Sequence, residues 1–282
     1  MKYIDIHCHL DFKDYDADRQ EVLARMKKGE VGAITIGTDL ESSKKAVEIA
    51  EENENIWACI GMHPEKPQGE TLGNSQGLTL GFREEEFQKL VQNPKVVAIG
   101  ECGLDWFRVT PENLESEKTR QTALFKKQIE FALKYYKPLM LHCRDSYDDV
   151  LAILESYKEA AGPEAEKLKG NSHFFAGNTE QAKKFLDLGF TMSFTGVITF
   201  LSRQSSAKAG TDLYEVIKYL PVESIMSETD APFVAPVPYR GKRNEPSYVI
   251  EVVKKLAELK GVETETMRAI LLANAQKLFN VL

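Results

Sequence analysis

Eight short apolar runs recur along the 282 residues, and a segment with helical period follows each of them. The runs do not alternate polar with apolar residues and contain many β-branched side chains, which is typical of strands buried on both faces of a parallel sheet. This repeated succession of strand and helix predicts a (β/α)8 barrel of the TIM type, with its chemistry at the C-terminal ends of the strands. The predicted strands span residues 3–6, 31–36, 56–60, 96–99, 139–141, 171–174, 190–194 and 224–226.

The predicted helices carry apolar residues on one side and have recognisable ends. Asp39 should cap the second helix, and Pro138 follows the fourth. Residues 65–83 and 160–169 are expected to be surface insertions. Because nothing marks a linker, residues 1–282 are expected to form a single domain. The predicted helices span residues 19–28, 40–52, 84–91, 119–136, 146–157, 179–188, 213–220, 247–259 and 263–282.

All five histidines lie at or beside the end of an apolar run. His7 and His9 are two residues apart, so in a strand both imidazoles point to the same face. Acidic residues close two further runs: Glu101 ends the fourth, and the stretch 228–230 ends the eighth. Unrelated histidines would not share this position, so we expect the side chains to converge at one rim of the barrel. The other three histidines are His63, His142 and His173.

This set of imidazoles and carboxylates is too large for one four-coordinate ion and suits two divalent ions that share a bridging acid. Glu101, in the middle of the series, is the expected bridge. Such ions would attract a phosphate and lower the pKa of a bound water, whose proton Asp230 is placed to take. A helix N-cap is the alternative role for Asp230. Imidazole-rich sites suit Zn, Mn, Fe or Ni, and Mg can also support activity, so the metal stays open.

Charged residues near these strand ends could contact a substrate. Arg144 lies two residues after His142, hence on the same strand face, and could bind a phosphate. Asp105 could orient a ligand, contact the substrate or stabilise a turn. Lys242 and Arg243 could lie on the rim and bind a nucleic-acid backbone, or be solvated. Nearby aromatic residues could stack on bases or pack against the protein; they are Trp106, Phe107 and Tyr239.

The 36 basic and 43 acidic residues give a net charge of −7, which argues against a protein that coats duplex DNA over its whole surface. With no leader-like start and no apolar run of membrane length, we expect a cytoplasmic monomer without a membrane partner. The cysteines lack paired metal-binding spacing. Three of them directly follow a candidate ligand, so their thiols should point into the layer between strands and helices as buried filler. The cysteines are Cys8, Cys59, Cys102 and Cys143.

Seven motifs in this order resemble the TatD family of metal-dependent deoxyribonucleases, within the wider amidohydrolase-like barrels. Each motif is weak alone, but together they run almost from end to end of the chain. They are Asp5-Ile6-His7-Cys8-His9-Leu10, Gly61-Met62-His63-Pro64, Gly100-Glu101-Cys102-Gly103-Leu104-Asp105-Trp106, His142-Cys143-Arg144-Asp145, His173-Phe174-Phe175-Ala176-Gly177, Glu228-Thr229-Asp230-Ala231-Pro232 and Gly241-Lys242-Arg243-Asn244-Glu245-Pro246.

The resemblance implies hydrolysis of DNA phosphodiester bonds, often by trimming single strands from the 3′ end, with His63 and Arg144 near the scissile phosphate. The chain departs from the family pattern at Phe174 and Ala176, where members commonly carry Cys and Ser, and in the insertion after Pro64. Both departures could alter substrate fit. The resemblance also implies one ion held by His7, His9, Glu101 and Asp230, and a second held by Glu101, His142 and His173.

Two other functions remain open from the sequence. The same polarised water attacks carbonyl carbon, so the substrate could be an amide or an ester, as in the deacylation of a D-aminoacyl-tRNA. Related amidohydrolases commonly bridge their metals with a carbamylated lysine, whereas this chain has Glu101, which favours the phosphoesterase branch. A non-catalytic binding barrel would predict lost ligands, and none is lost in these motifs.

Overall fold

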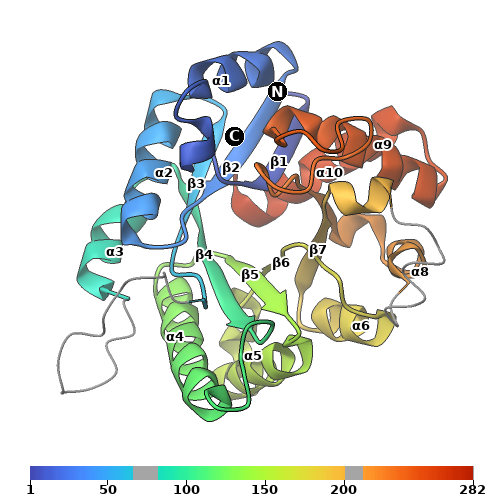
Figure 1. The fold of residues 1–282 in the computed structure, drawn as a ribbon. Helices are drawn as coiled ribbons and strands as arrows, with labels where there is room; N and C mark the ends of the chain where they lie inside the picture. Colours follow the sequence, from blue (N-terminus) through green and yellow to red (C-terminus); the bar gives the residue numbers. More distant parts are fainter. Residues whose placement is uncertain (66–81, 201–211, 282) are drawn as a thin grey trace.

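The computed structural model describes residues 1–65, 82–200 and 212–281, and it forms a nearly closed barrel of eight parallel strands with helices on the outside (Figure 1). The strands are hydrogen-bonded in chain order, each to the next. This architecture confirms the predicted TIM barrel. The strands are β1 (Tyr3–Cys8), β2 (Val31–Ile36), β3 (Ile56–Ile60), β4 (Val96–Asp105), β5 (Leu139–Arg144), β6 (Gly170–Ser172), β7 (Phe190–Phe194) and β8 (Ile225–Ser227).

The helices pack their apolar sides against the outer face of the barrel, which leaves their charged sides to solvent. None of those that the structure describes is long and apolar enough to cross a membrane. The α-helices are α1 (Arg19–Lys28), α2 (Leu40–Glu52), α3 (Glu84–Val91), α4 (Leu114–Lys134), α5 (Tyr147–Ala161), α6 (Thr179–Asp187), α8 (Leu213–Tyr219), α9 (Val249–Lys260) and α10 (Thr264–Phe279). Short 3₁₀ turns are η1 (Lys13–Tyr15), η2 (Gly162–Lys167), η3 (Gly196–Thr199), η4 (Val222–Ser224) and η5 (Pro246–Tyr248).

Residues just beyond β1 and β8 close the seam of the barrel. The Asp230 amide donates to the His7 carbonyl at 2.9 Å, and the His9 amide donates to the Ala231 carbonyl at 2.8 Å. The buried Asp5 carboxylate accepts hydrogen bonds from the backbone N–H and the hydroxyl of Thr229. The seam therefore joins the two stretches, far apart in sequence, that carry His7, His9 and Asp230.

A cluster of buried apolar side chains fills the barrel interior at its N-terminal end. Side chains from the strands, among them Ile6 and Met140, pack with Leu278 and Phe279 at the end of α10. The Asn274 side-chain amide of α10 donates to the carbonyls of Val222 in η4 and Ile225 at the start of β8, which holds this helix against the N-terminal end of the barrel. The histidines and acids of the candidate site lie at the opposite, C-terminal end of the strands.

Most predicted elements agree with the structure to within a few residues, but some boundaries were wrong. β4 runs on to Asp105 rather than ending near residue 99. Gly103 permits this extension because its φ is +143° and a Cβ there would collide with the His142 carbonyl of β5. β6 ends before His173, and α4 begins at Leu114 rather than at residue 119.

The two predicted insertions have different outcomes. Residues 66–81 of the first lie outside the described residues. The second is short: α5 continues to Ala161, and η2 connects it to the stretch before β6. The cysteines behave as predicted, because Cys8, Cys102 and Cys143 pack in the apolar layer against the helices. Burial raises the pKa of the Cys143 thiol to about 12, so the thiol is protonated at neutral pH.

Candidate metal centre

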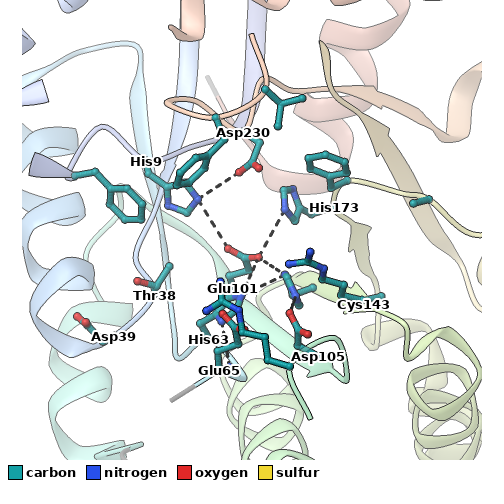
Figure 2. A pocket seen from close by; sticks show the side chains of 18 residues that line it. His9, Thr38, Asp39, His63, Glu65, Glu101, Asp105, Cys143, His173 and Asp230 are labelled. Carbon is teal, nitrogen blue, oxygen red and sulfur yellow. Dashed lines mark hydrogen bonds and ion pairs between the residues drawn. The ribbon is translucent and has the colours of Figure 1, made fainter. Parts of the chain in front are cut away.

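Glu101 occupies the middle of the C-terminal end of the barrel, and its two carboxylate oxygens face different histidines (Figure 2). Oε2 lies 3.4 Å from His7 Nε2 and 3.9 Å from His9 Nε2. Oε1 lies 2.6 Å from His142 Nδ1 and 3.6 Å from His173 Nε2. The side chain is 95% buried, because its relative exposure is 5%. One buried carboxylate is therefore shared between two groups of imidazoles.

The first group consists of His7, His9 and Asp230, whose possible ligand atoms all lie within 4.8 Å of one another. Asp230 Oδ1 is 3.8 Å from His7 Nε2 and 3.5 Å from His9 Nε2. His9 Nδ1 lies 3.0 Å from the Ile36 carbonyl, which can only accept. Nδ1 is therefore the donor, and in the neutral ring Nε2 keeps its lone pair toward the centre. The helix N-cap alternative for Asp230 was wrong, since no helix starts there.

His7 tests whether these residues fit a metal ion. Its side chain is fully buried, yet neither ring nitrogen has a hydrogen-bond partner within the described chain. Burying unpaired polar atoms is costly, so such groups normally have a partner. A divalent ion bound to Nε2 would supply one, and imidazole with carboxylate is a donor set that such ions accept. The first group therefore fits a metal ion.

The second group surrounds Glu101 Oε1. His63, Glu101 and His142 form a further set with ligand atoms within 4.8 Å, and His63 Nε2 lies 3.2 Å from His142 Nδ1. His142 Nε2 lies 2.8 Å from Asp105 Oδ2. Asp105 thus orients the His142 ring and presents Nδ1 to the centre. Its other oxygen accepts the Phe107 N–H at 2.9 Å, so two of the three roles considered for Asp105 agree with the structure. His63, expected near the phosphate, is also within reach of the metal donors.

Glu228 is a buried residue to which the sequence assigned no role of its own. Its Oε1 lies 3.1 Å from His173 Nδ1 and accepts the Phe174 N–H at 2.6 Å. Its Oε2 accepts the Ser193 hydroxyl at 2.7 Å. The carboxylate is thus fixed by Phe174 and Ser193 and makes an ion-pair contact with His173 Nδ1, while His173 Nε2 faces Glu101. The only signal in the sequence was an acid that closes the same run as Asp230.

We expect Glu228→Gln to weaken metal binding at the His173 side about 10- to 100-fold, the usual effect of losing a carboxylate that orients a metal-binding histidine. Titration calorimetry with Mn²⁺ or Ni²⁺, started from chelator-treated protein, measures this. The control is Glu215→Gln, which alters an exposed ion pair with Lys218 on α8. Equal affinities in Glu228→Gln and the unmodified protein would contradict the orienting role.

The charges of the site are strongly coupled. Burial, together with the neighbouring His173, lowers the pKa of His7 to about 3. Burial alone would also lower the pKa of His9 and His142. Carboxylates outweigh it, mainly Asp230 for His9 and Asp105 and Glu101 for His142, and raise each pKa to about 9. Despite burial, the imidazoles hold the Glu101 pKa well below its usual value. A metal ion must therefore displace protons from His9 and His142 at neutral pH.

This coupling predicts how the stability of the metal-free protein depends on pH. The folded-state pKa values of His9 and His142, about 9, lie above the ordinary 6.5. Their stabilising contribution is complete below pH 6.5 and is lost as the pH rises through 9. We expect the Tm of chelator-treated protein to fall by a few degrees across this window. Metal affinity should rise over the same window, because fewer protons compete.

Scanning calorimetry of the chelator-treated protein at a series of pH values measures the effect on stability. His9→Asn removes one of the two rings and should make the fall in Tm smaller. A Tm that stays constant, or falls equally in His9→Asn, would contradict the assignment.

A pocket of about 740 Å³ opens above the centre at the C-terminal mouth. His9, Glu101, His142, His173 and Asp230 form part of its lining, together with His63, Asp105 and Arg144, whereas His7 is covered. Arg144 is exposed, and its guanidinium lies 3.5 Å from the centre of the Phe107 ring. Phe174 and Ala176, the two departures from the family pattern, line the same pocket.

Two predicted substrate contacts lie elsewhere. Arg243 does not line the pocket; its guanidinium forms a forked ion pair with Asp18 at 2.7 and 2.6 Å and covers the ring of Tyr15. Arg243 therefore holds its loop against the start of α1. The sequence did not indicate this structural role. Lys242 is exposed and also outside the pocket lining.

Of the two interpretations given for the aromatic residues near the site, contact within the protein describes Tyr239 and Trp106. Tyr239 stacks on Tyr248 at 3.7 Å, and the Trp106 indole donates to Asp149. Another ring of the protein therefore covers Tyr239, and Asp149 engages the N–H of Trp106. Three phenylalanines line the pocket: Phe174, which the sequence singled out as a departure from the family pattern, and Phe12 and Phe233, which it did not single out.

Comparison with known proteins identifies similar chains and structures. A family model described as TatD related DNase matches residues 4–280. The uncharacterized metal-dependent hydrolase YabD of Bacillus subtilis is 36% identical, over 98% of this chain and 98% of its own. The Klebsiella pneumoniae protein named 3′-5′ ssDNA/RNA exonuclease TatD is 32% identical, over 98% of this chain and 97% of its own. The crystal structure of YjjV, a TatD homolog from Escherichia coli, superposes with a TM-score of 0.80 at 28% identity, covering 100% of this chain and 99% of that one.

Proposed function

The chain belongs to the TatD-related DNase family of metal-dependent hydrolases, and from this premise we propose that it hydrolyses DNA phosphodiester bonds at two divalent ions, removing nucleotides from the 3′ ends of single strands. The observation that carries the proposal is the shared Glu101 carboxylate, each of whose oxygens faces its own group of imidazoles. The name of the Klebsiella pneumoniae relative supports the choice of substrate and direction.

His7, His9 and Asp230 would hold the first ion with Glu101 Oε2. His142 and His173 would hold the second with Glu101 Oε1. Bound ions supply the positive charge that polarises a phosphoryl oxygen and brings the pKa of water toward neutrality. Two dications would place four positive charges at the floor of the pocket, where a phosphate oxygen can bind although the whole chain is acidic. Mg, Mn, Zn, Fe and Ni all remain compatible with these donors.

The chain's own residues then act from the pocket side. Asp230 is partly open to the pocket, with 14% of its side chain exposed, and can accept the proton of the attacking water. Arg144 presents a fork of donors from the pocket wall and can hold the phosphate against the centre. His63, on the same wall, can contact the phosphate from the Glu101 side. These roles define a hydrolysis that needs no covalent enzyme intermediate.

A single-stranded oligonucleotide labelled at its 5′ end, incubated with Mg²⁺, Mn²⁺ or Zn²⁺, tests the proposal. We expect a ladder of labelled products that shortens stepwise from the 3′ end, no products with chelator-treated protein, and slower digestion of a blunt duplex. A strand with phosphorothioate linkages at its 3′ end should resist digestion. The absence of turnover with every metal would overturn the nuclease assignment, and release of the labelled nucleotide first would overturn the polarity. A D-aminoacyl-tRNA assayed in parallel identifies an ester hydrolase.

A further inference from the structure

We propose that Phe12 and Phe233 form an aromatic shelf that holds a base of the substrate beside the metal centre, and that this shelf favours an unpaired nucleotide. The inference rests on the proposed function and concerns the part of the nucleic acid that the same pocket recognises. It follows from the position of the two rings, from the exposure of Phe233 and from the charges around them.

The two rings are attached to the centre through their own backbone. The Phe12 N–H donates to the carbonyl of His9 at 3.1 Å, and the Phe233 N–H donates to the carbonyl of Asp230 at 2.9 Å. Each phenylalanine thus closes a turn that begins at a candidate ligand three residues earlier. The Asn244 amide also donates to the Phe233 carbonyl at 2.6 Å. The shelf is therefore held in a fixed place relative to His9 and Asp230.

The rings also contact one another and the centre. Phe12 stacks on the His9 imidazole, with ring centres 4.4 Å apart and planes 20° apart. Phe233 meets Phe12 edge to face at 6.1 Å and meets His9 in the same manner at 6.3 Å. These are favourable aromatic geometries, so the cluster needs no rearrangement to present a surface. A planar group placed on the shelf would lie directly beside the candidate ligand His9.

Exposure separates Phe233 from the phenylalanines of the core. It is 49% exposed and lines the pocket, whereas Phe175, Phe185 and Phe194 are at most 1% exposed. Its open ring is part of the apolar surface of the pocket, and a ligand that covers the ring would remove that surface from water. The shelf is thus a binding surface beside the site of reaction.

The surrounding charges indicate the ligand. Arg108 and Arg144 line the same pocket, and the donors of the centre are suited to dications that attract phosphate. In a nucleotide, a sugar joins the phosphate to a flat aromatic base. The phosphate would bind at the charged centre while the base lies on the aromatic shelf. Base–aromatic stacking accepts every base. A base inside a duplex is covered on both faces by its neighbours, so it must leave the stack before it can lie on the shelf, whereas a base of a single strand is free to do so.

The decisive experiment compares strands that differ by the loss of one base. Single strands carrying an abasic tetrahydrofuran residue at the 3′-terminal or the next position are tested against the intact strand, with unmodified protein and with Phe233→Ala. We expect Phe233→Ala to raise KM and the Kd of the intact strand about 5- to 100-fold. The KM for the strand whose abasic residue falls on the shelf should not change. Phe233→Trp, which keeps a flat ring, should restore affinity for the intact strand.

Tyr219→Ala is the matched control, because Tyr219 is 47% exposed on α8 and lies outside the pocket lining. It should leave every KM unchanged. Phe12→Leu provides a second variant of the shelf, and thermal unfolding verifies that each variant is folded. Equal losses for intact and abasic strands, or no loss for either, would overturn the shelf.

Binding and cleavage together separate this inference from the proposed function. The Kd values come from fluorescence polarisation and do not require turnover. If the strands are cleaved but Phe233→Ala does not discriminate between intact and abasic strands, the shelf is wrong and the nuclease assignment stands. If no strand is cleaved, the assignment fails, and the Kd comparison still decides whether the pocket recognises a base.

Discussion

Asp230→Asn should reduce kcat for phosphodiester hydrolysis about 10²- to 10⁴-fold, the range expected when a general base is removed. Asparagine has nearly the same shape, so the seam hydrogen bond from the Asp230 backbone N–H to His7 should persist. The amide cannot accept the proton of the attacking water, and it binds a divalent ion less strongly than a carboxylate does. Single-turnover cleavage of a labelled single strand at saturating metal separates the loss of the base from weaker metal binding.

Asp39→Asn is the matched control for this change. Asp39 lines the same pocket, but its carboxylate caps α2 by accepting the Ser42 N–H at 2.7 Å. Asparagine is an equally good N-cap, so stability and turnover should both be nearly unchanged. A kcat of Asp230→Asn within tenfold of the unmodified protein would remove Asp230 from the catalytic role.

Glu101→Gln should have the largest effect on metal binding. Both carboxylate oxygens face imidazole groups, and glutamine replaces one oxygen by an NH₂ that can only donate. Metal affinity should fall by more than about 10²-fold, beyond the loss expected for a residue that only orients a ligand. Turnover at low metal concentration should become undetectable. Elemental analysis of the purified variant, with titration calorimetry, measures the number of bound ions and their affinities.

Glu65→Gln provides the comparison for Glu101→Gln. Glu65 also lines the pocket, but it pairs with Arg108 at 3.3 Å and belongs to neither imidazole group. It should keep the full complement of ions and nearly full turnover. If Glu101→Gln retained two ions with unchanged affinity, Glu101 would not be the shared ligand, and the two-ion centre would lose its basis.

Much of the candidate site was predictable, because the ends of the apolar runs in the sequence indicate which residues lie at the rim of the barrel. The ends of buried parallel strands meet at one rim, so a histidine or acid that closes an apolar run is directed there without knowledge of its partners. This reasoning selected His7, His9, Glu101, His142 and His173. It could not place Arg243, because a cationic loop after the last strand says nothing about the Asp18 carboxylate that engages Arg243 from a segment far away in sequence.

The sequence by itself determined the succession of strands and helices, the barrel that follows from it and the residue types available at its mouth, since periodicity and run endings are local properties. Only the tertiary structure decided that Glu101 divides its oxygens between two imidazole groups, that Glu228 orients His173 and that Phe233 stays open beside His9. Those relations depend on how β1 and β8 close the barrel and on the direction in which each side chain leaves its strand. They are set by contacts between segments far apart in the chain, and no local pattern records them.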